Sequence, residues 1–240
     1  MKLLRKLYAL YGMLLFMLVV LVAALFIFLF LTFRIGPRKG VNAGLNSIRI
    51  GTQVLHRLLF IRIVKHGKEH IHPERKPYIV VYNHQSFLDI PAASCSVPFG
   101  VRYLGKVELM KIPVFGYILK KMTVIVDRRN KHDRSKSLDS LRRSLAEGVS
   151  VMIAPEGTRN KTASPVQPFY DGAFRLALET KVPILVITIK GRGNLLRGTQ
   201  HMELRPGRID TWVDEPVQVM PGDTLDTLKE RTRQCMLRHL

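Results

Sequence analysis

The sequence predicts an α/β domain with a mostly parallel central sheet covered by helices, preceded by an N-terminal membrane helix. Short β-branched apolar runs alternate with stretches of helical periodicity, which is typical of a sheet built from strand–helix–strand units. Several of these runs are apolar almost throughout, as expected for strands that are covered on both faces. The start of the chain, in contrast, contains a long stretch without any charge.

That uncharged stretch is residues 8–33. As a helix it would be roughly 39 Å long, which is more than the hydrocarbon core of a bilayer requires. A secretory signal has a shorter apolar region and a small-residue cleavage site, and the Arg-Ile-Gly-Pro-Arg that follows offers no such site. We therefore expect residues 1–40 to form an integral membrane anchor. Basic residues flank both ends, so the positive-inside rule leaves its orientation open.

The next segment, residues 41–64, mixes apolar residues with cations such as Arg49 and Arg57. This pattern fits a helix that lies in the lipid headgroup layer. It fits equally well a core helix whose basic side is solvated. On this basis residues 41–66 are assigned as a basic membrane-associated helix, and residues 67–240 as the α/β domain.

The chain is strongly basic, with 38 Lys and Arg against 18 Asp and Glu and a formal net charge of +20. Such an excess indicates a polyanionic partner, either nucleic acid or an anionic membrane surface. Proteins that bind single strands interleave aromatic and basic residues, whereas Trp212 is the sole tryptophan here. A membrane-tethered nucleic-acid-binding protein is therefore the disfavoured alternative, and no nucleic acid partner is expected. We expect the domain to face the cytoplasm, at the inner membrane if the source is bacterial.

Metal and cofactor chemistry find no support in the sequence. Cys95 and Cys235 stand in no metal-binding spacing, and the histidines lack a matching set of ligands. Phosphate-binding and dinucleotide-binding glycine motifs are absent as well. We therefore expect neither a metal nor a cofactor.

Six strands are expected in the domain, at residues 78–82, 101–104, 123–126, 149–153, 184–190 and 209–213. Helices are expected at residues 136–147, 171–180 and 224–240. Polar segments follow the first and the fourth strands. Because the carboxyl ends of parallel strands meet at one edge of a sheet, these two segments are expected to share a site.

The first polar segment, residues 83–89, places the imidazole of His84 five positions before the carboxylate of Asp89. In a regular helix the two side chains would point about 140° apart, so His84 must lie on the turn before the helix. Pro91 is tolerated only in the first turn of a helix, which places the helix start just before it. Asp89 can then hold Nδ1–H of His84 and leave Nε2 free to take a proton. The alternative interpretation is an N-cap at Ser86 or Asp89, with His84 as a turn residue.

The second polar segment, residues 154–160, reads Ala-Pro-Glu-Gly-Thr-Arg-Asn. A glycine and backbone amides beside a guanidinium are suited to a phosphate, since arginine binds phosphate oxygens bidentately. Taken alone, the segment fits equally well a surface turn with a solvated Arg159.

Together, Asn-His-x4-Asp and the later Pro-Glu-Gly-Thr-Arg resemble the glycerolipid acyltransferases, most closely the 1-acyl-sn-glycerol-3-phosphate (lysophosphatidic acid) acyltransferases. The resemblance covers roughly residues 78–190. Two further segments of the family pattern fall in the right order, at residues 106–116, running on to 126–128, and at residues 172–175.

The resemblance implies a membrane O-acyltransferase that transfers a fatty acyl group from a thioester to the free hydroxyl of a lysophospholipid. With 1-acyl-sn-glycerol-3-phosphate as acceptor the product is phosphatidic acid. The donor, acyl-CoA or acyl carrier protein, stays open. His84 would be the general base and Asp89 its orienting partner. The implied substrate-binding residues are Lys106, Arg128, Glu156, Gly157, Thr158 and Arg159.

Direct transfer is favoured over an acyl-enzyme because no serine or cysteine nucleophile is evident beside His84. The oxyanion would then need donors, expected from backbone N–H groups near the turn that carries His84. One departure from the family pattern concerns Asp171, which stands where a lysine often precedes Gly-Ala-Phe. The alternative function is therefore an O-acyltransferase of the same fold that uses another lyso-acceptor.

Overall fold

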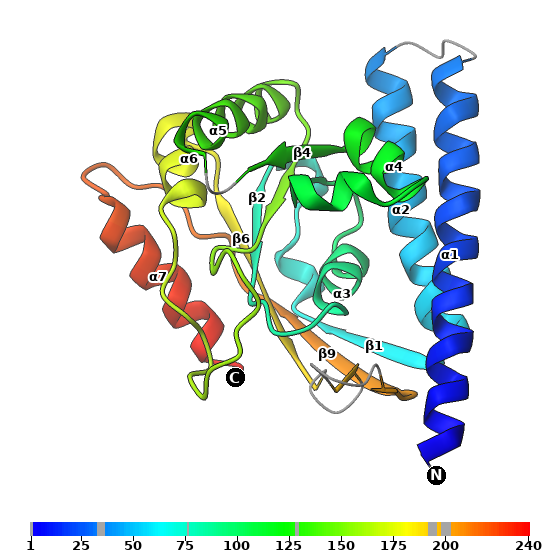
Figure 1. Cartoon of the computed structure of the whole chain (residues 1–240). Coiled ribbons are helices and arrows are strands. Elements are labelled where there is room, and N and C mark those ends of the chain that lie inside the picture. Colours follow the sequence, from blue (N-terminus) through cyan, green and yellow to red (C-terminus); the bar gives the residue numbers. More distant parts are fainter. Residues whose placement is uncertain (1, 33–36, 76, 128–129, 192–195, 198–202) are drawn as a thin grey trace.

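The computed structural model describes residues 2–32, 37–75, 77–127, 130–191, 196–197 and 203–240. A seven-stranded sheet in the order β1-β9-β6-β2-β5-β3-β4 forms the centre of the molecule (Figure 1). The predicted α/β class with a mostly parallel sheet is confirmed. Within this sheet the strand pairings are parallel except that of β6 with β9, which is antiparallel.

The strands of this sheet are β1 (Ile61–His66), β2 (Ile79–Tyr82), β3 (Arg102–Lys106), β4 (Thr123–Val126), β5 (Val151–Ile153), β6 (Ile184–Lys190) and β9 (Gly207–Val213). A separate two-stranded ribbon joins β7 (Leu196–Arg197) to β8 (Glu203–Leu204). The α-helices are α1 (Lys2–Thr32), α2 (Pro37–Leu58), α3 (Asp89–Ser96), α4 (Phe115–Met122), α5 (Lys131–Ala146), α6 (Gly172–Thr180) and α7 (Leu225–Leu237). All six predicted strands and the three predicted helices are present, with ends that differ by a few residues.

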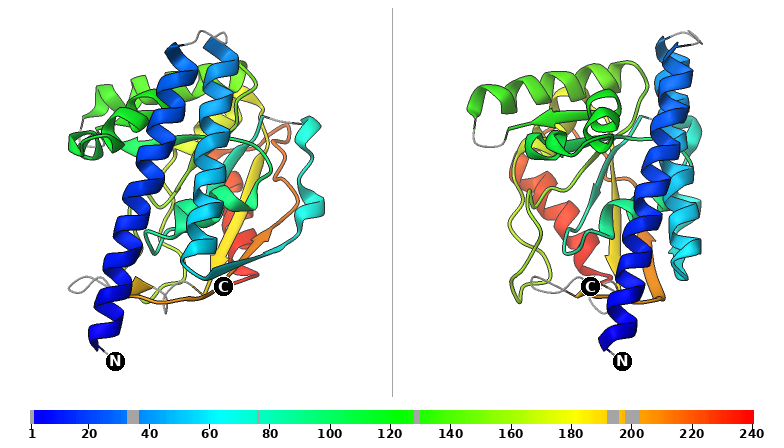
Figure 2. Two further views of the ribbon diagram at one scale, coloured as in Figure 1. Left: turned by 90° about the vertical axis from the view of Figure 1, so that its right-hand side faces the viewer. Right: turned by 45° about the vertical axis from the view of Figure 1, so that its right-hand side comes forward.

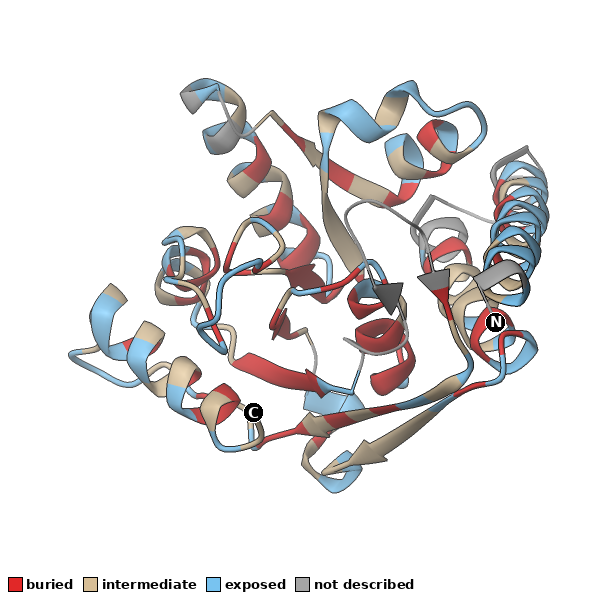
Figure 3. Ribbon diagram, turned by 60° about the horizontal axis from the view of Figure 1, so that its bottom comes forward, coloured by how far each residue is buried: buried red, intermediate tan, exposed pale blue. Residues whose placement is uncertain are grey.

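Strand β2 shows how the layers are built. Its alternate side chains face opposite ways: Val80 and Tyr82 pack in the core beneath α2 and α3, whereas Ile79 and Val81 pack beneath α5, α6 and α7. All four are buried, and burial of such a side chain contributes about 1.5–3 kcal/mol. The resulting three layers are visible in Figure 2, and Figure 3 shows buried residues running along the central strands.

The structure differs from the sequence prediction between residues 58 and 66. Helix α2 ends at Leu58, and a turn through Phe60, whose φ is +46°, leads into β1. Strand β1 pairs in parallel with β9, which lies far along the chain. Local periodicity carries no information about such a remote partner, so the apolar and basic residues of this stretch look like a continued helix in the sequence.

Helix α1 contains a stretch, Leu4–Leu29, that is long and apolar enough to cross a membrane, with a mean hydropathy of 3.1. Only 22% of its apolar window is buried within the protein, so it is not an ordinary core helix. It lies beside α2 and touches the domain, for example through the Tyr11 hydroxyl, which donates to Leu58 O at 3.0 Å (Figure 2). At the middle of the helix, Phe16 packs on Phe115 of α4 with ring centroids 5.9 Å apart.

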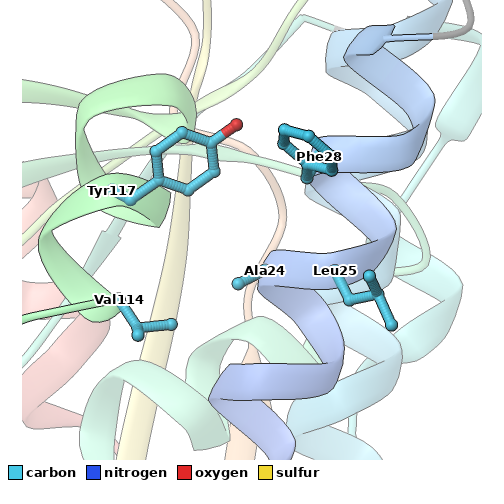
Figure 4. A pocket seen from close by; sticks show the side chains of 5 residues that line it. All are labelled: Ala24, Leu25, Phe28, Val114 and Tyr117. Atoms are coloured by element: carbon cyan, nitrogen blue, oxygen red, sulfur yellow. The ribbon is translucent and has the colours of Figure 1, made fainter.

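An apolar pocket of about 360 Å³ opens between α1 and α4 (Figure 4). Its walls are Ala24, Leu25, Phe28, Val114 and Tyr117. None of these residues was predicted to bind substrate, and the pocket adds to the apolar surface that α1 presents.

Candidate active site

The parallel strands β2, β5 and β3 are neighbours in the sheet, so the segments that follow them emerge at the same edge. His84 follows β2, Glu156 and Arg159 follow β5, and Lys106 is the last residue of β3. The topology thus brings the two predicted polar segments together. In the following, residues 83–89 are called the base loop and residues 154–160 the cation loop.

The His84 and Asp89 side chains meet as the spacing predicts. Nδ1–H of His84 donates to Oδ2 of Asp89 at 3.0 Å, with the histidine side chain 17% exposed and the carboxylate fully buried. The same oxygen accepts from the backbone amides of Gln85, at 2.6 Å, and Ser86, at 2.7 Å. The carboxylate therefore shapes the turn and orients the imidazole at once, and Nε2 of His84 is the nitrogen left to accept a proton.

Asn83 fixes the start of the base loop, a role that the sequence interpretation did not assign. Its buried amide side chain accepts from Ile189 N at 2.8 Å and donates to Ile189 O at 3.1 Å. These two bonds imitate backbone pairing and continue the β2–β6 ladder by one residue. The backbone of His84 is thereby held against the sheet.

Glu156 joins the two loops. Its buried carboxylate accepts from His84 N at 2.7 Å through Oε1 and from Gln167 N at 2.9 Å through Oε2. Beside it, Asn160 N donates to His84 O at 2.6 Å. Glu156 was expected among the substrate-binding residues; the structure directs both of its oxygens to backbone amides, which makes it a brace between the loops.

Gly157 and Thr158 form the bend of the cation loop. Gly157 has a φ of +68°, which favours glycine, and a Cβ at this position would lie 2.7 Å from the ring of Tyr170 unless that ring moved. Thr158 is exposed, and its backbone N donates to Glu156 O at 2.7 Å. The bend brings Arg159 back toward the base loop.

The guanidinium of Arg159 lies over the ring of Phe87, with Cζ 3.8 Å from the ring centroid. Within the described part of the chain it makes no hydrogen bond or ion pair. Lys106 is exposed at the end of β3 and, toward the residues that the structure covers, is likewise unpaired. Both cations are therefore available to an anionic ligand. Arg128, the third predicted cation, lies outside the described residues.

The negative charge of Asp171 is engaged elsewhere. Its carboxylate forms an ion pair with Lys229 on helix α7. The departure from the family pattern at this position is therefore compensated locally by a cation of this chain.

Most of the backbone N–H groups that we expected as oxyanion donors already have partners within the protein. The backbone N–H groups of His84, Gln85 and Ser86 donate to Glu156 and Asp89, and that of Leu88 donates to Ser86 Oγ at 3.2 Å. In the described part of the chain the backbone N–H of Phe87 has no such partner, so an oxyanion donor from the base loop stays a prediction.

Neither cysteine has the properties of an activated nucleophile. Burial raises the pKa of the Cys95 thiol, and burial likewise raises the pKa of Cys235, so both stay protonated at neutral pH. No group of three or more potential metal-binding side chains occurs among the residues that the structure describes. The chemistry of this edge thus centres on the oriented imidazole and the cations.

A family model described as Acyltransferase matches residues 62–190, which is more than half of the chain. This protein therefore belongs to the acyltransferase family. Among its relatives is a 1-acyl-sn-glycerol-3-phosphate acyltransferase from Chlamydomonas reinhardtii, 32% identical over 183 residues, which are 75% of this chain and 54% of the relative. The mouse 1-acyl-sn-glycerol-3-phosphate acyltransferase alpha is 31% identical over 74% of this chain and 63% of its own length.

A solved structure extends the similarity to the whole fold. The 1-acyl-sn-glycerophosphate (LPA) acyltransferase PlsC from Thermotoga maritima superposes with a TM-score of 0.83 at 26% identity. The match covers 99% of this chain and 95% of that protein. The chain spans about half the length of the first curated relatives, from Chlamydomonas reinhardtii and Brassica napus.

Proposed function

We propose that this protein transfers a fatty acyl group from an acyl thioester to the free hydroxyl of 1-acyl-sn-glycerol-3-phosphate, forming phosphatidic acid. The observation that carries the proposal is an oriented imidazole, His84, beside the guanidinium of Arg159, on loops held together by Glu156. Among the described residues this guanidinium has no hydrogen bond or ion pair. The relatives named for this reaction, and the similar Thermotoga maritima structure, support it.

In the proposed mechanism, Nε2 of His84 removes the proton from the acceptor hydroxyl as its oxygen attacks the thioester carbonyl carbon. Asp89 stabilises the imidazolium that forms, because its carboxylate already accepts Nδ1–H. When the tetrahedral intermediate collapses, the C–S bond breaks and the imidazolium returns its proton to the leaving thiolate. The scheme needs no covalent acyl-enzyme and no cofactor, and it runs with acyl-CoA or with acyl carrier protein as donor.

The phosphate of the acceptor is proposed to bind Arg159, with Lys106 as second cation. Arg128 is proposed as a further phosphate-binding cation on the basis of the sequence pattern alone. Thr158 and Gly157 shape the binding loop, while Glu156 acts by holding that loop against His84. The ion pair with Lys229 neutralises the charge of Asp171, and the panel of acceptors below tests the other headgroups.

The membrane supplies the acceptor lipid. We propose that α1 is embedded in it as an integral anchor, because its apolar window is largely uncovered by protein. The excess of 38 basic over 18 acidic residues favours attachment of the domain to an anionic cytoplasmic surface. Helix α2, with exposed Arg57, is proposed to lie along that surface.

The test is mass spectrometry of the lipids that the purified full-length protein forms from a panel of lyso-acceptors with each of the two donors. We expect phosphatidic acid from 1-acyl-sn-glycerol-3-phosphate as the main product. Faster acylation of a lyso-acceptor without a phosphomonoester would overturn the proposed substrate, and absence of acylation with every pair would overturn the activity.

A further inference from the structure

The ring of Phe87 forms a contact between the two halves of the site that the proposed mechanism does not use. It lies on the base loop, and the Arg159 guanidinium of the cation loop covers its face at 3.8 Å from Cζ to the centroid. A cation over an aromatic face within about 6 Å is attracted by the ring quadrupole. At this short separation the planar guanidinium and the ring are in van der Waals contact.

The base loop holds Phe87 outward. The flanking residues Ser86 and Leu88 are buried, whereas Phe87 is 61% exposed. Ser86 N donates to the Asp89 carboxylate and Leu88 N donates to Ser86 Oγ, so the backbone is fixed on both sides of the ring. One exposed aromatic side chain is common on protein surfaces and indicates nothing by itself. The observation that points to a role is the guanidinium on its face.

We propose that Phe87 is a positioning residue for Arg159 and thereby for the acceptor phosphate. The N–H donors of a guanidinium point outward in its plane, so a ring against one face leaves them available for bidentate contact with a phosphate. In the described part of the molecule the guanidinium forms no hydrogen bond or ion pair, and the Phe87 ring packs against its face. The ring therefore limits the orientations of a long, flexible side chain. This inference rests on the proposed phosphate role of Arg159.

The experiment measures kcat and KM of full-length Phe87→Leu, Phe87→Tyr, Arg159→Ala and the Phe87→Leu/Arg159→Ala double variant. The acceptors are 1-acyl-sn-glycerol-3-phosphate and the matching 1-acylglycerol without phosphate. Phe87→Leu should raise KM for the phosphorylated acceptor about two- to fivefold with little change in kcat. Phe87→Tyr keeps a ring face and should behave like the wild type. Phe60→Leu, which changes another exposed phenylalanine outside the site, is the matched control and should leave both constants unchanged.

The double variant decides between positioning and simple packing. If Phe87 acts through Arg159, its loss adds nothing once Arg159 is alanine. Three results would each overturn the proposal. The first is a double variant in which the losses of the two single variants multiply. The others are a Phe87→Leu loss that is equal on both acceptors and a Phe87→Tyr variant whose KM is raised like that of Phe87→Leu. The proposed function fails separately, when Arg159→Ala itself costs the same factor on both acceptors. The coupling between the two residues is still read from the double variant in that case. Unchanged melting temperatures show that the variants are folded.

Discussion

The base loop and the cation loop lie at the same sheet edge, but their functional side chains are held in different ways. In the base loop, the backbone amides of His84, Gln85, Ser86 and Leu88 all donate within the protein. The cation-loop amides of Gly157, Thr158 and Asn160 donate within the protein as well. The difference lies in the side chains: His84 is held by Asp89, whereas among the described residues the Arg159 guanidinium contacts only the face of Phe87. A proton-transferring group must be held in place before the substrate arrives, whereas a substrate-binding cation must keep its donors available. The contrast matches the roles proposed above, proton transfer for the base loop and phosphate binding for the cation loop.

The strongest test of this contrast is removal of the base. His84→Ala should lower kcat by about 10²–10⁴-fold, because the acceptor hydroxyl is then no longer deprotonated as it attacks. Asp89→Asn should cost less than loss of the base, since it disturbs only the orientation of the imidazole and the turn. The measurement is steady-state kinetics on folded, purified protein. Near wild-type turnover by His84→Ala would exclude the base mechanism.

Substitutions in the cation loop should change the preference for phosphorylated over phosphate-free acceptors. Loss of a charge-assisted bidentate contact costs roughly 1.5–3 kcal/mol, so Arg159→Ala should lower kcat/KM about tenfold to more than a hundredfold with a phosphorylated acceptor. Arg159→Lys keeps the charge but loses the planar fork, so its kcat/KM should lie between those of the wild type and Arg159→Ala. An acceptor without phosphate should lose little with either variant. If both acceptors lost the same factor and the melting temperature fell as well, Arg159 would only be holding its loop.

The brace between the loops should affect stability and activity together. In the wild type the Glu156 carboxylate accepts hydrogen bonds from two backbone N–H groups. Glu156→Gln turns an amide NH₂ toward one of these donors, and the lost hydrogen bond should cost about 1–3 kcal/mol of stability. We expect a melting temperature lower by a few degrees and a reduced kcat with both kinds of acceptor. Glu179→Gln removes an exposed carboxylate paired with Arg142 and serves as control. A loss confined to the phosphorylated acceptor would mean that Glu156 acts on the substrate and not on the loops.

The smallest expected effect concerns the contact between α2 and α3, the helix that follows the base loop, and the pH dependence of stability that this contact gives. His56 of α2 is buried, donates through Nδ1 to Thr52 O at 2.7 Å and touches Cys95 of α3, the helix that begins with Asp89. Burial lowers the pKa of His56, so the unfolded chain binds a proton at a higher pH than the folded protein. The stabilisation is therefore complete above a pH of about 6.5 and decreases as the pH falls below it.

Thermal unfolding at pH values of about 7.5 and 5.5 measures this effect. The melting temperature of the wild type should fall on acidification, and His56→Gln should lose part of that dependence. His132→Gln replaces an exposed histidine and should keep it. An unchanged dependence in His56→Gln would show that the α2–α3 contact does not sense protons in this range.

The predictable parts of the molecule are those whose signal is local. Strand β6 was predicted with its observed ends because it is apolar almost throughout and buried on both faces. The meeting of His84 and Asp89 followed from their spacing and from Pro91. In contrast, β1, the amide pairing of Asn83 with Ile189, and the reach of Glu156 to His84 N depend on partners that are remote in sequence. The spacing of residues within one segment cannot reveal such partners.

The position of β1 at the sheet edge has a consequence for synthesis of the chain. Ile61 pairs with Gly207, so the partner strand leaves the ribosome only after most of the domain has been made. At about 5–20 residues per second, β1 waits roughly 7–30 s with its backbone groups unpaired. During this interval Arg62 and Lys65 discourage pairing with other chains, as charged residues on edge strands do. Closure of the sheet is therefore expected to be among the last events of folding, with the nascent chain already held at its N-terminal helix.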